Sequence, residues 1–208
     1  MDTPLLLFDG PENTDLVVVL AHGAGAPMDS PFMNEIAAGL ADRGLRVARF
    51  EFAYMQARRD GGGKRPPDRQ PVLLETWRQV ISSFEDPSRL IIGGKSMGGR
   101  MASMIADDAG IAGLVCLGYP FHAPGRADKP RTEHLATLKT PALILQGERD
   151  PFGGPDEVAT YSLSDQIAVT WLPDGDHDLK PRKKSGVSHA ENLDRAIAQI
   201  AEFADALA

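Results

Sequence analysis

The chain has 208 residues, of which 42% are hydrophobic and 25% charged, an ordinary composition for a water-soluble globular protein. Its net charge of −7 argues against general nucleic-acid binding, which needs an excess of Lys and Arg on one face. The single cysteine, Cys116, excludes an intramolecular disulfide and a multi-cysteine zinc site, and it suits a reducing cytoplasm.

The first residues predict neither a secretion signal nor a membrane anchor. The chain starts with Asp2 in place of a basic region, and the apolar run at 5–8 is far shorter than a signal-peptide core. No stretch approaches the roughly 20 apolar residues of a membrane span. We therefore expect a soluble cytoplasmic protein without membrane contact, folded as one domain over residues 1–208.

Apolar runs alternate with longer amphipathic segments along the chain. The runs predict strands at 15–23, 45–52, 89–94, 111–120, 141–150 and 167–175. The amphipathic segments predict helices at 31–42, 70–85, 97–108, 154–162 and 187–207. Nearly continuous apolar strands that alternate with helices indicate an α/β fold, a mostly parallel sheet with helices on both faces.

The segment LIIGGKSMGGRMA, residues 90–102, contains the candidate nucleophile. Its letters GKS suggest a phosphate-binding loop, but the glycine that such a loop needs seven residues before its serine is Arg89 here. Residues 94–98 instead match G-x-S-x-G between a predicted strand and a predicted helix, which is typical of a sharp turn that exposes a serine hydroxyl. A tight glycine turn with an incidental serine is the simpler interpretation of this segment alone.

Ser96 needs a histidine to remove its proton and an acid to orient that histidine. Asp150 and His177 each follow the end of a later predicted strand, in the chain order Ser, Asp, His that nucleophile-elbow hydrolases use. Three other carboxylates compete for the role of the acid because they crowd the histidine: Asp174, Asp176 and Asp178. We favour Asp150 because of its place at a strand end.

A negatively charged oxygen that forms during catalysis needs two backbone N–H donors. Met97, at the start of the helix after the serine, is one candidate. The glycine-containing segment AHGAGA, residues 21–26, follows an early strand and offers Ala24 or Gly25 as the second.

With these residues in view, the sequence resembles the α/β-hydrolase superfamily, and within it the small serine hydrolases without a cap near the dienelactone-hydrolase-like branch. The resemblance extends over nearly the whole chain through HGAGA, FEFAYM, GKRPPD, GGKSMGGRMA, GERDPFG and DHDLKPRKKSG. The chain departs from the pattern at Ala53, where proline is expected. Dienelactone hydrolases proper use cysteine where this chain has Ser96, so their substrate does not carry over. The group is also similar to a domain of a chromatin-complex subunit.

The resemblance and the residue order together predict a serine hydrolase that cleaves small carboxylic esters or thioesters through an acyl-enzyme, with no cofactor and no metal. The segment 121–131 is too short for a lid, which favours an open site. A non-catalytic interaction domain that retains the fold is the alternative, and a peptidase is a less favoured one.

Two basic loops, at 57–70 and 174–186, leave predicted strands at the end where ligands bind in a parallel sheet. They suggest an anionic substrate, bound by Arg58, Arg65 and Lys180, although charge runs are by default solvated surface. His22 is a further candidate for contact with substrate or for ordering the segment 21–26. The final helix leaves a homodimer open.

Overall fold

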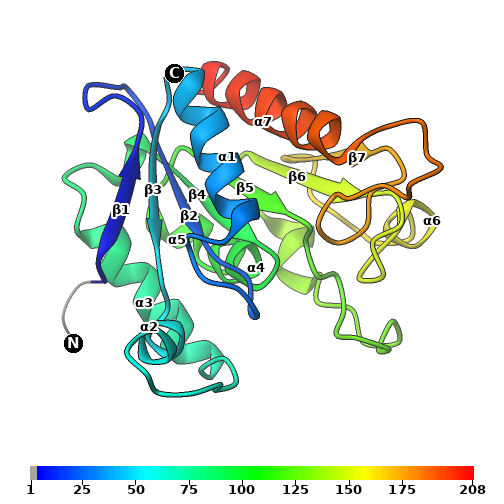
Figure 1. Cartoon of the computed structure of the whole chain (residues 1–208), viewed down its shortest axis with the longest axis horizontal. Helices are drawn as coiled ribbons and strands as arrows, with labels where there is room; N and C mark the ends of the chain where they lie inside the picture. The colour runs from blue at the N-terminus through cyan, green and yellow to red at the C-terminus, as the bar shows by residue number, and fades with distance from the viewer. Residues whose placement is uncertain (1–3) are drawn as a thin grey trace.

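A seven-stranded sheet forms the centre of the computed structural model, which describes residues 4–208 (Figure 1). Its strands are β1 (Leu6–Asp9), β2 (Val17–Ala21), β3 (Arg46–Phe50), β4 (Leu90–Lys95), β5 (Gly113–Leu117), β6 (Ala142–Gly147) and β7 (Ile167–Leu172). They lie in the order β1-β3-β2-β4-β5-β6-β7, and β1 pairs antiparallel with β3 while the other neighbours pair in parallel. The predicted mostly parallel sheet is confirmed, and β1 is a strand that the sequence patterns did not predict.

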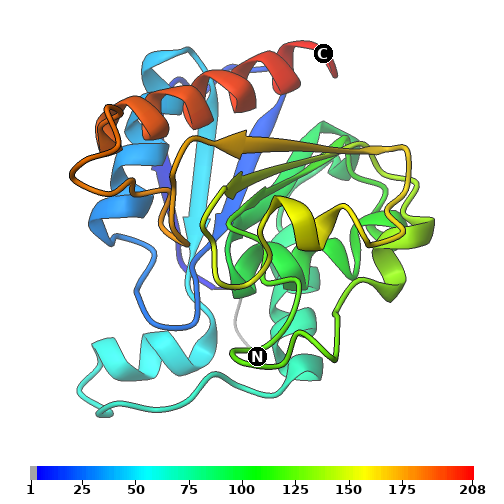
Figure 2. The same ribbon diagram turned by 90° about the vertical axis from the view of Figure 1, so that its right-hand side faces the viewer.

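Helices cover both faces of this sheet (Figures 1 and 2). They are α1 (Pro31–Asp42), α2 (Ala53–Arg59), α3 (Gln70–Ser82), α4 (Met97–Ser103), α5 (Ala106–Ala109), α6 (Pro155–Val158) and α7 (His189–Asp205), with 3-10 turns at Pro87–Arg89 and Glu133–Thr137. α1 and α7 contact each other on one face, and α3 and α4 contact each other on the opposite face.

Two predicted helices and one predicted loop need correction. The predicted helix 97–108 is divided between α4 and α5, and the predicted helix 154–162 is reduced to the single turn of α6. The basic loop 57–70 begins inside a helix, α2, whose N-cap residue Phe52 makes no side-chain hydrogen bond to the helix. Short helices of this kind depend on tertiary packing, which propensity does not register.

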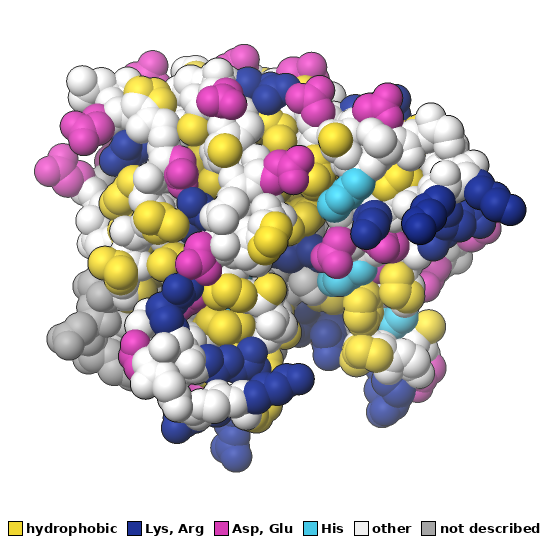
Figure 3. Space-filling view, viewed as in Figure 1, with side chains coloured by type: hydrophobic (Ala, Val, Ile, Leu, Met, Phe, Trp, Pro, Cys, Tyr) yellow, Lys and Arg dark blue, Asp and Glu magenta, His cyan; other side chains and the backbone are white. Residues whose placement is uncertain are grey.

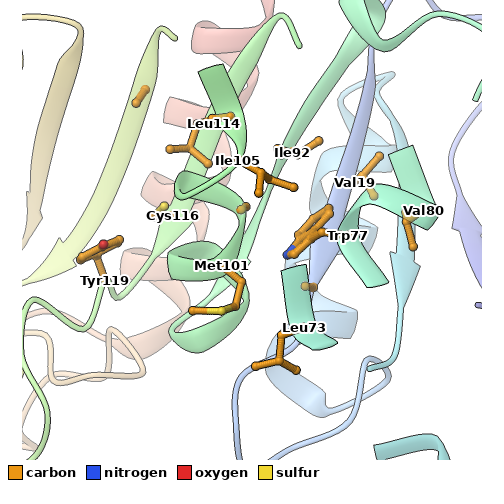
Figure 4. Packing of buried hydrophobic residues seen from close by; sticks show 14 of the residues in the cluster. Val19, Leu73, Trp77, Val80, Ile92, Met101, Ile105, Leu114, Cys116 and Tyr119 are labelled. Carbon is orange, nitrogen blue, oxygen red and sulfur yellow. The ribbon is translucent and has the colours of Figure 1, made fainter. Parts of the chain in front are cut away.

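The central strands are buried on both faces, as the apolar runs predicted. All six residues of β4 are buried. Trp77 of α3 packs into the core on the α3–α4 side, close to Val19 and Ile92 of the sheet (Figure 4). The second core, between the sheet and helices α1 and α7, contains fully buried side chains such as Ile36. Close packing on both faces fixes the sheet and therefore the loops at its edge.

The parallel strands β2, β4, β5 and β6 all end at one edge of the sheet, so the segments that follow them meet there. The segment after β5, residues 118–132, contains no helix, and within residues 4–208 no cap domain covers this edge. Among the described residues, no helix combines the length and the hydropathy that a bilayer crossing requires.

Candidate active site

Ser96 lies on the turn between β4 and α4 in a strained backbone conformation, with φ 50° and ψ −112°. A positive φ is uncommon for a residue other than glycine, and it aims the side chain out of the turn. Gly98 makes the turn possible because a Cβ there would lie 2.6 Å from the Ala21 carbonyl oxygen and 2.7 Å from that of His22. The G-x-S-x-G spacing is thus explained by close approach of α4 to the end of β2.

The structure brings the three side chains of the predicted triad into one hydrogen-bonded chain. Ser96 Oγ lies 2.9 Å from His177 Nε2, and His177 Nδ1 lies 2.8 Å from Asp150 Oδ2. Because a carboxylate only accepts, Nδ1 carries the proton in the neutral ring, and Nε2 is left as the acceptor that faces the serine hydroxyl.

Asp150 is buried and held by further hydrogen bonds. Its Oδ1 accepts from the Phe152 N–H at 2.9 Å, and its Oδ2 accepts from Gln146 Nε2 at 3.0 Å. Gln146 Oε1 in turn accepts from the Tyr119 N–H at 2.7 Å. The carboxylate is therefore fixed in one orientation, with Oδ2 toward His177.

The three competing carboxylates are engaged elsewhere. Asp174 forms an ion pair with Arg182 at 2.5 Å, and this hydrogen bond lowers the pKa of Asp174 to about 2. Asp176 Oδ1 accepts a hydrogen bond from the backbone N–H of Lys180 at 3.0 Å, so it stabilises the turn of the loop that carries His177. Asp178 pairs with Lys95 at 3.2 Å. Among the four acids, it is Asp150 that contacts His177 Nδ1.

Lys95 is a functional candidate that the sequence interpretation missed. It is buried, and its Nζ donates to the His177 carbonyl oxygen at 2.7 Å. Burial lowers the pKa of Lys95, an effect that Asp178 opposes. The Phe152 ring contacts the imidazole of His177 on another side, at 4.5 Å between centroids. The backbone and the ring of His177 are therefore held from different directions.

His22 orders the segment after β2 and is fully buried. Its Nε2 accepts from the Phe52 N–H at 3.1 Å, so Nδ1 carries the proton and donates to the Gly23 carbonyl oxygen at 2.6 Å. Burial lowers the pKa of His22, which keeps this ring neutral. Tyr54 OH adds a hydrogen bond to the Ala24 carbonyl oxygen at 3.0 Å. The full burial of His22 disfavours contact with substrate, whereas its hydrogen bonds agree with a role in ordering the segment 21–26.

Two adjoining pockets flank Ser96, and both are also lined by Ala24 and Phe152. One has a volume of about 370 Å³ and includes His177; we call it the histidine pocket. The other has a volume of about 360 Å³ and includes Met97 but not His177; we call it the helix pocket. Of the predicted oxyanion donors, Met97 lines the helix pocket, Gly25 the histidine pocket and Ala24 both.

The three basic residues predicted to bind substrate line neither pocket. Arg58 lies over the Tyr54 ring at 5.2 Å and donates to the Arg65 carbonyl oxygen, while Arg65 and Lys180 are exposed. Figure 3 shows Lys and Arg side chains gathered over the segment between α2 and α3 and over the loop before α7. Other residues of the two loops, among them Asp68 and His177, line the pockets, but these three basic side chains do not.

The remaining candidates for chemistry are a metal centre and the thiol of the single cysteine. Within residues 4–208, no group of three or more His, Cys, Asp and Glu side chains could hold a metal ion. Cys116 is fully buried in β5, where burial strongly raises the pKa of its thiol.

Comparisons with known proteins agree with this architecture. One solved structure, Est1E from Butyrivibrio proteoclasticus, has a TM-score of 0.70 and 14% identity, and the match covers 97% of this chain and 94% of that one. Dienelactone hydrolase from Anabaena variabilis has a TM-score of 0.69 and 18% identity, covering 97% and 88%. An α/β serine hydrolase without lid from Xanthomonas campestris has a TM-score of 0.61 and 18% identity, covering 97% and 86%.

These structures are similar to this chain in fold. A family model described as "Alpha/beta hydrolase domain" matches residues 14–205, which is most of the sequence. The chain therefore belongs to the alpha/beta hydrolase domain family.

Proposed function

We propose that this hydrolase cleaves carboxylic esters through an acyl-enzyme on Ser96. The observation that carries the proposal is the unbroken hydrogen-bonded chain from Ser96 Oγ through His177 to Asp150, set on a strained turn at the mouth of two pockets. Orientation before reaction is what allows a weak nucleophile such as a serine hydroxyl to attack a carbonyl.

In the first half of the reaction, Ser96 Oγ attacks the acyl carbonyl while His177 Nε2 takes its proton. Asp150 stabilises the imidazolium that forms and remains ionised. When the tetrahedral intermediate collapses, the bond between the acyl carbon and the leaving oxygen breaks, and His177 returns the proton to that oxygen. A water molecule then repeats the sequence on the acyl-enzyme and releases the acid.

The backbone N–H of Met97, in the first turn of α4, supplies one donor to the negatively charged oxygen. Ala24 supplies the second. The Gly23 carbonyl oxygen is held by His22 and Tyr54, and in a trans peptide the following N–H points the opposite way. The Ala24 N–H is thus turned away from the side on which His22 and Tyr54 lie. Ala24 is favoured over Gly25 because it lines both pockets.

The position of His177 indicates which part of the substrate each pocket binds. The leaving oxygen must receive its proton from His177 Nε2, so the leaving group occupies the histidine pocket, which this residue lines. The acyl group then extends into the helix pocket on the other side of Ser96. Each pocket has room for a small organic group, which favours small esters over long lipids.

The names of similar structures support an ester, lactone or thioester substrate. An esterase domain from Rhodothermus marinus, a dienelactone hydrolase and a thioesterase domain from the curacin pathway are among them. The alternative of a non-catalytic interaction domain is disfavoured because nothing about the fold alone requires Ser96, His177 and Asp150 to be aligned within hydrogen-bond distance.

The proposal is tested by the intact mass after exposure to a fluorophosphonate. We expect one adduct on the wild type and none on Ser96→Ala. The chain offers a matched control, because Ser103 Oγ also lies 2.9 Å from a histidine, His134 Nε2, but no acid contacts that ring among the described residues. Ser103→Ala should label like the wild type. A folded wild type that acquires no adduct and hydrolyses no ester would overturn the proposal and favour the interaction domain.

A further inference from the structure

The helix pocket contains two arginines that the sequence interpretation did not single out. Arg100 lies on α4, one helical turn after Ser96, and Arg131 lies at the end of the segment that follows β5. Both side chains are half-buried, and both line the pocket that we assign to the acyl group. They belong to neither basic loop.

Neither guanidinium has a protein partner. In the part of the chain that the structure describes, no carboxylate lies within ion-pair distance of Arg100 or Arg131, and their side chains make no hydrogen bond. Arg100 Nε is buried and unsatisfied. Burial lowers the pKa of Arg100, and the positive charge of Arg131 lowers it further.

Two positive groups of this kind are costly to keep close together. A buried donor that lacks an acceptor, and a charge that lacks a counter-charge, each disfavour the folded state. Two other arginines with buried or half-exposed side chains have carboxylate partners: Arg59 bonds Glu51 and Asp29, and Arg49 bonds Asp9. Arg58 also has a buried Nε without a partner, but its terminal nitrogen donates to the Arg65 carbonyl oxygen. An anion held between Arg100 and Arg131 would supply the missing acceptors.

The rest of the pocket restricts where an anion can lie. Leu73, Met101 and Pro120 are among the apolar residues that line it, and they suit a hydrocarbon chain. Asp68 is the carboxylate among the lining residues, and its Oδ2 accepts from the Tyr54 N–H at 3.1 Å. Asp68 therefore bonds the first turn of α2 and forms no ion pair with Arg100 or Arg131.

We propose that Arg100 and Arg131 form an anion-binding subsite of the acyl pocket, and that the preferred substrates are monoesters of dicarboxylic acids whose free carboxylate these arginines bind. Arginine suits this task because its planar fork donates two parallel hydrogen bonds to a carboxylate. This inference rests on the proposed ester hydrolysis and adds its substrate class. The anion would then bind in the helix pocket beside Ser96 and not at the basic loops.

The test compares two esters that differ in one group. Mono-4-nitrophenyl adipate and 4-nitrophenyl hexanoate have acyl chains of the same length, and the first alone ends in a carboxylate. The measured quantity is the ratio of their kcat/KM values. We expect a preference for the adipate ester, and a fall in that ratio of about 10- to 100-fold in Arg100→Met and in Arg131→Met.

Arg58→Met and Arg65→Met are the matched controls, because these arginines lie outside the pocket; they should keep the wild-type ratio. Arg100→Lys, which retains the charge, should keep part of the preference if Arg100→Met proves unstable. Fluorophosphonate labelling of each variant separates the two proposals. Labelling and hexanoate turnover without any adipate preference, or a preference that survives both pocket variants, would overturn the subsite and leave the ester hydrolase standing. Absence of labelling in the folded wild type would overturn both.

Discussion

Lys95 Nζ donates a 2.7 Å hydrogen bond to the backbone carbonyl oxygen of His177, so the residue beside the nucleophile holds the loop of the base. The same ammonium pairs with Asp178 at 3.2 Å. Lys95 is the first variable position of the G-x-S-x-G motif, and it is buried although lysine is rarely so. This contact joins β4 to a loop that lies 82 residues later in the chain.

Lys95→Met tests whether this contact positions the base. The variant keeps the apolar stem but loses the donor, so we expect kcat for a 4-nitrophenyl ester to fall about 10-fold while KM changes little. Lys64→Met, at an exposed lysine outside both pockets, is the control. An unchanged kcat in a folded Lys95→Met would show that His177 needs no support from β4.

Tyr54→Phe tests the orientation of the Ala24 N–H. The variant removes the hydroxyl that donates to the Gly23 carbonyl oxygen at 3.3 Å, in the same peptide as the Ala24 N–H, while it retains the ring. We expect kcat to fall about three- to tenfold, the effect of one hydrogen bond on the transition state. Tyr161→Phe, which loses a hydroxyl bound to Glu157 away from Ser96, should leave kcat near the wild-type value. Equal kcat values in the two variants would contradict this role.

The parts of the site that depend on strand order were predictable from the sequence. Ser96, Asp150 and His177 each follow a recognisable apolar strand, and parallel strands bring their carboxyl ends to one edge. Residues more than 80 positions apart could therefore be placed together before any side-chain geometry was known.

The parts of the site that depend on the direction of a side chain could not be predicted from the sequence. The basic loop around Arg58 has a strong charge signal, but charge does not say which way a side chain points. Lys95 and Arg100 stand alone as cations within an apolar segment, and no local pattern distinguishes them from surface residues. β1 pairs with β3 on one side only and has four partly exposed residues, so the short apolar run at 5–8 does not by itself distinguish a strand from a terminal segment.

Gly98→Ala tests the close approach beneath the nucleophile. The added Cβ would meet the carbonyl oxygens of Ala21 and His22, which belong to backbone and cannot rotate away. Overpacking of this kind costs about 1–3 kcal/mol, so we expect Tm to fall by about 2–10 °C. Gly154→Ala is the control, because its nearest atom, the Glu148 carbonyl oxygen, is 3.5 Å from the added Cβ. Equal Tm values for the two variants would contradict the crowding argument.

His22 makes the stability of the fold depend on pH. Burial lowers the pKa of His22 below its ordinary value of 6.5, so the unfolded chain binds the proton at a pH where the native chain does not. The free energy of unfolding should therefore fall as the pH decreases below about 6.5, by up to about 1.4 kcal/mol per unit for one histidine. Half-buried His134, whose pKa partial burial also lowers, acts in the same direction. Urea unfolding of the wild type between pH 7.5 and 5 measures the slope, which should be smaller in His22→Asn and retained in His189→Gln, at the half-buried first residue of α7. A slope that His22→Asn leaves unchanged would mean that the ring is not held neutral beneath the loop that carries Ala24.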